Sequence, residues 1–68
     1  MAITIGSNIS AVREAMGYTQ SGLARKIGTC QSAVSQIENG QRNPSFAVLL
    51  KIKRGLGVTW AALLRGIE

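Results

Sequence analysis

The sequence is poor in several residue types, and each scarcity excludes a class of function. It has no histidine and only three acidic residues, so clusters of metal ligands, histidine-based catalysis and paired catalytic carboxylates are excluded. Its one cysteine, Cys30, cannot form an internal disulfide, which favours a reducing cytoplasm. No apolar run approaches the roughly 18 residues of a membrane span. We therefore expect neither an enzyme nor a membrane protein, and no metal or other cofactor.

What is present is a short and basic chain. Its 68 residues leave room for one domain, and a domain of this size buries only about 60% of the surface of its unfolded chain. Eight lysines and arginines give a net charge of +5, which favours a polyanionic partner, either a nucleic acid or an acidic membrane surface. The first residues, MAITIGSN, have neither the basic region nor the apolar core of a secretion signal, so we expect none.

Helical spacing and capping residues predict an all-α fold of five short helices. Residues 1–6 are expected to form a flexible arm and residues 67–68 a short C-terminal end. Ser7 or Asn8 would cap the first helix, and Gly17 would end it. Its buried stripe would consist of Ile9, Val12 and Met16.

The later helices have equally clear limits. Thr19, Ser45 and Thr59 precede helical patterns and are suited to cap them. Gly40 and Gly57 are suited to end helices in the left-handed conformation. The buried stripe of the fourth helix would be formed by Phe46, Leu49, Ile52 and Leu56.

The stretch QSGLARKIGTCQSAVSQIENG, residues 20–40, has the spacing of a helix-turn-helix. Gly28 marks the turn, where a positive φ is needed. Small or apolar residues occupy the positions at which the two helices would cross, namely Leu23, Ala24, Val34 and Ile37. A second helix supported in this way can present its outer face to a DNA groove.

The outer face of that second helix is polar but uncharged. An advance of about 100° per residue places five side chains on it: Gln31, Ser32, Ser35, Gln36 and Asn39. Solvated helix faces normally carry Lys and Glu, whereas amides and hydroxyls suit base edges, which need donors and acceptors in defined directions. The alternative is a helix that is merely solvated.

Four motifs carry a resemblance to a known family: TQSGLARKIG, QSAVSQIENG, NPSFAVLLKIKRGLGV and WAALLRG. With these motifs the chain resembles the DNA-binding domain of the lambdoid phage repressors and Cro proteins, the Xre-type helix-turn-helix family. The resemblance implies a compact five-helix, lambda-repressor-like domain over residues 7–66, with the helix-turn-helix at helices 2 and 3. It also implies a transcription regulator, most often a repressor, that binds a palindromic double-stranded DNA operator as a homodimer in the cytoplasm of a bacterium or phage-infected host.

The resemblance also implies roles for individual residues. Gln31, Ser32 and Gln36 match positions that read bases, and Ser35 lies on the same face.

The DNA backbone would be held by Asn39 and Arg42, and Gln20 would contact a phosphate or help to read the outermost base. Arg13 and Glu38 match an ion pair that is largely buried in some relatives.

Several alternatives remain open at this point. Trp60 and Leu64 would form a dimer contact, or Trp60 would cap the core of the monomer. Cys30, in place of a better helix cap, would be a redox-sensitive contact or a tolerated small residue. The chain would be a protein-interaction module if its basic side faced away from helix 3, since Lys51, Lys53, Arg54 and Arg65 all follow it. Glu68 would end a whole regulator or the N-terminal domain of a longer one. Nothing in the sequence indicates a small-molecule ligand.

Overall fold

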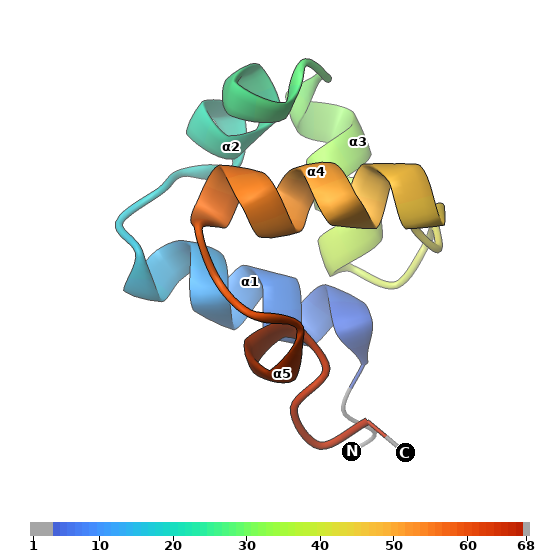
Figure 1. Ribbon diagram of the computed structural model, residues 1–68. Helices are drawn as coiled ribbons and strands as arrows, with labels where there is room; N and C mark the ends of the chain where they lie inside the picture. The colour runs from blue at the N-terminus through green and yellow to red at the C-terminus, as the bar shows by residue number, and fades with distance from the viewer. Residues whose placement is uncertain (1–3, 68) are drawn as a thin grey trace.

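The computed structural model describes residues 4–67, which form five helices and no strand. The helices are α1 (Ile5–Ala15), α2 (Gln20–Ile27), α3 (Gln31–Glu38), α4 (Phe46–Leu56) and α5 (Trp60–Leu63). The α2–α3 pair occupies one end of the molecule, α4 crosses the middle, and α5 packs against α1 at the opposite end (Figure 1). The all-α architecture expected from the sequence is confirmed.

One apolar core joins all five helices. Each helix contributes at least one buried side chain: Ile9, Leu23, Ala24, Val34, Ile37, Ile52, Leu56 and Leu63. Ala24 is only 2% exposed, which agrees with the expectation that a small residue is needed where α2 and α3 cross. The four crossing residues predicted from the helix-turn-helix spacing are all in this core.

The helix limits from α2 onward follow the predicted caps. The hydroxyls of Thr19, Ser45 and Thr59 each accept a hydrogen bond from the backbone N–H three residues later, at 2.9, 3.2 and 3.3 Å. Gly28 and Gly57 end α2 and α4 with φ values of +78° and +69°. These elements were predictable because caps and stops depend on neighbouring residues only.

The first helix begins earlier than predicted. Thr4 is its cap: the Thr4 hydroxyl accepts from the Ser7 N–H, and the Ser7 hydroxyl accepts from the Thr4 N–H, both at 3.1 Å. Ser7 is therefore the partner in a capping box rather than the cap itself. Residues 4–6 of the expected arm belong to the cap and to α1, while residues 1–3, like Glu68, lie outside the described residues.

Two side chains expected in the core are on the surface. Met16 is 50% exposed because α1 ends at Ala15 and Met16 falls on the cap. Phe46 is 71% exposed because the inward face of α4 is set by Ile52 and Leu56, and the first residue of the helix lies outside that stripe.

Two glycines allow close approach between helices. A methyl group at Gly6 would overlap the backbone carbonyl oxygen of Ile37, so α1 rests directly on the last turn of α3. At Gly55, a methyl group would come within 3.0 Å of the Ile27 side chain on α2. A glycine at position 55 lowers the helix propensity of α4, but it allows α4 to pack closely against the helix-turn-helix.

Candidate nucleic-acid interface

The polar side of α3 lies on the outside of the molecule. Val34 and Ile37 are 1% and 4% exposed and attach the other side of the helix to the core. Gln31, Ser32 and Asn39 are exposed, and the remaining two residues of the predicted face, Ser35 and Gln36, are half-buried. Three of its five side chains are exposed, so the described part of the chain leaves most of this face uncovered, while α3 itself lies between α2 and the loop that leads to α4 (Figure 1). Its side chains therefore form a continuous uncharged surface of donors and acceptors.

A buried polar network holds the C-terminal end of α3. Arg13 Nε donates to Glu38 Oε2 at 2.7 Å and Arg13 Nη2 to Glu38 Oε1 at 3.2 Å. The two side chains are 10% and 3% exposed. Arg13 Nη1 also donates to the carbonyl oxygen of Tyr18 at 2.7 Å. The hydrogen bond with Glu38 raises the pKa of Arg13 despite its burial. This network connects α1, the α1–α2 loop and α3.

Gln20 belongs to the same network. Its Nε2 donates to Glu38 Oε1 at 2.9 Å, and the residue is half-buried at the start of α2. Because the acceptor is a carboxylate, the orientation of the amide is fixed with nitrogen towards Glu38. The nitrogen carries a second hydrogen, which remains for an acceptor such as a phosphate oxygen. The link between Gln20 and Glu38 was not predicted, since it depends on the crossing of α2 and α3.

The N-terminal end of α3 is held less firmly. Cys30 takes the capping position, but its side chain makes no hydrogen bond to the backbone of the first turn. The thiol is exposed and lies 3.6 Å from the Ser32 hydroxyl. This hydrogen bond lowers the pKa of Cys30.

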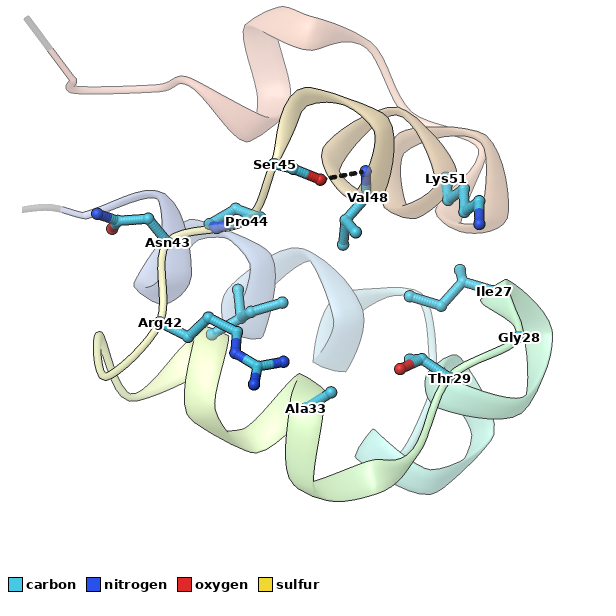
Figure 2. A pocket seen from close by; sticks show the side chains of 11 residues that line it. Ile27, Gly28, Thr29, Ala33, Arg42, Asn43, Pro44, Ser45, Val48 and Lys51 are labelled. Atoms are coloured by element: carbon cyan, nitrogen blue, oxygen red, sulfur yellow. Dashed lines mark hydrogen bonds between the residues drawn. The ribbon is translucent and has the colours of Figure 1, made fainter.

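The two remaining backbone candidates follow α3. Asn39 Nδ2 lies 3.4 Å from the Ser35 hydroxyl, at the exposed end of the polar face. The Arg42 N–H donates to the Gln36 carbonyl oxygen at 3.2 Å. The Arg42 side chain is exposed and extends from the loop over α3 towards Ala33 (Figure 2). Both residues are thus adjacent to the polar face.

Trp60, one of the two residues of the predicted dimer contact, is half-buried against the core and belongs to an aromatic pair that the sequence did not reveal. Phe46 stacks on Trp60 with ring centroids 5.8 Å apart, and Lys53 Nζ lies 5.6 Å from the Trp60 ring centroid. Lys53 thus extends along the surface, as a lysine on a helix facing the core must. Leu64, the other predicted contact residue, is 44% exposed.

Leu63 anchors α5 in the core, and one asparagine of α1 binds the end of this helix. Asn8 Nδ2 donates to the carbonyl oxygens of Leu63 and Arg65, both at 2.8 Å. Asn8, considered above as a cap for its own helix, in fact caps the end of another helix.

No group of histidine, cysteine and carboxylate side chains within residues 4–67 is arranged to hold a metal ion. None of the helices described is long and apolar enough to cross a membrane.

The fold and the exposed face of α3 define the class of protein: two crossed helices with a tight glycine turn, supported by three further helices, form a helix-turn-helix domain. The chain belongs to the helix-turn-helix family HTH_3, whose model matches residues 9–63. The resemblance and the fold expected from the sequence are both confirmed. This is a family of binding proteins, and the chain is not an enzyme.

Named relatives and solved structures agree with this assignment. Control protein C.MunI of Mycoplasma sp is 37% identical over 67 residues, which cover 97% of this chain and 90% of that protein. The transcriptional regulator SinR of Bacillus subtilis is 43% identical over 61 residues, covering 88% of this chain but only 55% of SinR. The P22 c2 repressor, solved in complex with a synthetic operator, has a TM-score of 0.83 at 28% identity, over an alignment that covers 96% of this chain and 98% of that one.

Proposed function

We propose that this protein is a sequence-specific regulator of transcription that inserts α3 into the major groove of double-stranded DNA. The single observation that carries this proposal is the uncharged polar face of α3, which is left uncovered by the rest of the fold. Two similar proteins, the P22 c2 repressor and SinR, have been solved in complex with operator and DNA, respectively. The net charge of +5 adds the attraction for phosphates that any such protein needs.

The side chains of α3 would read bases. Gln31 is exposed in the first turn and can make a bidentate contact with adenine N6 and N7, worth ~1–3 kcal/mol of discrimination. Ser32, Ser35 and Gln36 continue the same surface. We expect Gln31→Ala to weaken binding to the specific site and to leave non-specific binding nearly unchanged, as measured by titration of both duplexes. Equal losses on both would exclude base reading by Gln31.

The DNA backbone would be held by Gln20, Asn39 and Arg42. The orientation of Gln20 by Glu38 favours a phosphate as its partner, because one hydrogen of Nε2 is donated to Glu38 and the second can be donated to a phosphate oxygen. Arg42→Ala should weaken binding to all duplexes and reduce the slope of log K against log salt by about one unit. An unchanged slope would place Arg42 away from the DNA.

Binding as a homodimer to a palindromic operator would follow from the small size of the module, since half-sites one helical turn apart need two copies. The surface we assign to the dimer lies around α5 and consists of the exposed side chains of Phe46 and Leu64 together with Trp60, which is half-buried and stacks on Phe46. Sedimentation of the protein with and without an operator duplex tests whether it forms this dimer. Selection from random DNA should yield a palindrome, and a non-palindromic consensus would count against a symmetric dimer.

The default effect of such a dimer on a promoter is to block RNA polymerase, so we assign the protein as a repressor acting in the cytoplasm. The relatives include the control protein C.MunI and the immunity repressor of Bacillus phage phi105, and a solved restriction-modification controller protein, C.AhdI, has a similar structure. A reporter gene placed behind the selected site should lose expression when the protein is present, and increased expression would instead make the protein an activator.

A further inference from the structure

A groove of about 460 Å³ lies between α3 and α4, beside the polar face. Its apolar surface comes from the end of α2, the inner flank of α3 and the first turns of α4: Ile27, Ala33, Ile37 and Val48. The turn at Gly28 and Thr29 closes one end and the 42–45 loop closes the other (Figure 2). A concave, mostly apolar site with a few polar groups at its rim is the usual form of a small-molecule site.

The charge at the rim has one sign. Arg42 and Lys51 are the charged residues among those that line the groove, and no acidic side chain lines it. Arg42 extends from the loop into the groove above Ala33, and Lys51 projects from α4 on the side of Ile27 (Figure 2). The only acidic residue of α3, Glu38, is occupied by Arg13 and Gln20 on the other side of the helix. The groove therefore has an unneutralised positive rim above an apolar floor.

We propose that this groove binds a small amphiphilic acid, a linear monocarboxylate of about eight carbons, with its carboxylate on Arg42 and its chain on the apolar floor. A guanidinium binds a carboxylate through two parallel hydrogen bonds, and the chain removes the exposed parts of Ile27, Ala33 and Val48 from water. A small inorganic anion would gain nothing from that floor. A ligand of about ten heavy atoms in an open groove binds weakly, with a Kd on the order of 0.1–1 mM.

The acid also competes with DNA, and this second part rests on the proposed function. Arg42 is assigned to a phosphate, and a guanidinium that holds a carboxylate is no longer free to hold the DNA backbone. By linkage, the acid must weaken DNA binding by the same factor by which DNA weakens binding of the acid.

Sodium octanoate, below its micelle concentration, is the probe for the first part. In ¹⁵N–¹H spectra of the free protein, we expect saturable shifts at Ala33, Arg42 and Val48. Sodium acetate has the head without the chain, and octylammonium has the chain with the opposite charge, so neither should produce these shifts. Shifts spread over the whole surface, or equal shifts with octylammonium, would overturn the proposed site.

Matched variants locate the head group and the chain. Arg42→Gln should weaken octanoate binding at least about fivefold, whereas Arg54→Gln, which removes the same charge from an exposed position of α4 outside the groove, should change it less than about twofold. Ala33→Leu fills the floor and should abolish the shifts while Trp60 fluorescence and circular dichroism confirm the fold. Unchanged binding in Arg42→Gln would refute the role of Arg42.

DNA binding is then measured at saturating octanoate against the same concentration of sodium acetate, so that ionic strength is equal. We expect the Kd for the selected duplex to rise at least about threefold in the wild type and by much less in Arg42→Gln. Localised octanoate binding with an unchanged Kd for DNA would overturn the competition. Absence of DNA binding in acetate alone would refute the proposed function, while the spectra of the free protein would still decide whether the acid site exists.

Discussion

Replacement of Arg13 by methionine should be the most damaging single change in the network that supports α3. Arg13 donates two hydrogen bonds to the Glu38 carboxylate and one to the Tyr18 carbonyl oxygen. Its loss leaves a carboxylate whose side chain is 3% exposed with only the amide of Gln20 as partner. Breaking a buried pair on one side costs ~3–5 kcal/mol. A chain of this size has a total stability on the order of 5 kcal/mol, so Arg13→Met should retain only ~0–2 kcal/mol and should be partly unfolded at room temperature.

The double variant Arg13→Met/Glu38→Leu separates the pair from its members. With both charges removed, the free energy of unfolding should return to within ~1–2 kcal/mol of the wild type, because an apolar pair replaces a buried ionic one at little net cost. Urea denaturation, followed by the fluorescence of the single tryptophan, Trp60, gives all four free energies of the cycle.

Two outcomes would refute this reasoning. Additive losses in the double variant would show that Arg13 and Glu38 do not stabilise one another. A loss in Arg13→Met that disappears at about 1 M salt would show a solvent-screened pair rather than a buried one. Arg25→Met is the control, since Arg25 is exposed on α2 and its replacement should change stability by less than about 0.5 kcal/mol.

Three further changes test the packing and the start of α3. Gly6→Ala should lower the free energy of unfolding, measured by urea denaturation, by ~1–3 kcal/mol because its methyl group meets a backbone carbonyl. Gly55→Ala, whose methyl group meets a side chain, should change it by less than ~1 kcal/mol. Equal effects of the two substitutions would contradict the close approach of Gly6 to α3. Asn8→Ala should speed amide exchange in α5 selectively, since both carbonyl oxygens at its end lose their donor. Because a hydrogen bond with Ser32 lowers the pKa of Cys30, Ser32→Ala should move the pH midpoint of alkylation by iodoacetamide upward, and an unmoved midpoint would exclude that cause.

The parts of the fold that depend on neighbouring residues could be predicted from the sequence. Thr19, Ser45 and Thr59 each cap a helix with an N–H three residues away, so the signal is contained in four residues. The outward phase of Gln31 and Ser32 also follows from the helix period alone. The predicted start of α1 was wrong because Thr4 and Ser7 are both suitable caps. The packing of Ile5 on the core favours the earlier one.

Features created by contacts between distant residues could not be predicted. Gly6 has no local reason to be glycine, since its constraint is a carbonyl oxygen on α3. Asn8 serves a helix that follows it by more than fifty residues. The exposed position of Phe46 became clear only from the placement of Trp60, on which it stacks. The groove between α3 and α4 has no sequence signal either, because its lining comes from four separate segments.

The two ends of α3 are held to different degrees. Its last turn is fixed by the Glu38 carboxylate and by contact with Gly6, whereas its first turn has no side-chain acceptor from Cys30. We therefore expect the C-terminal turn of α3 to be rigid and its N-terminal turn to be more mobile. Gln31 and Ser32 lie in this N-terminal turn, so the turn could adjust to the shape of each DNA site without disturbing the core. Within α3, amide hydrogen exchange should be fastest at these two residues until a duplex is added.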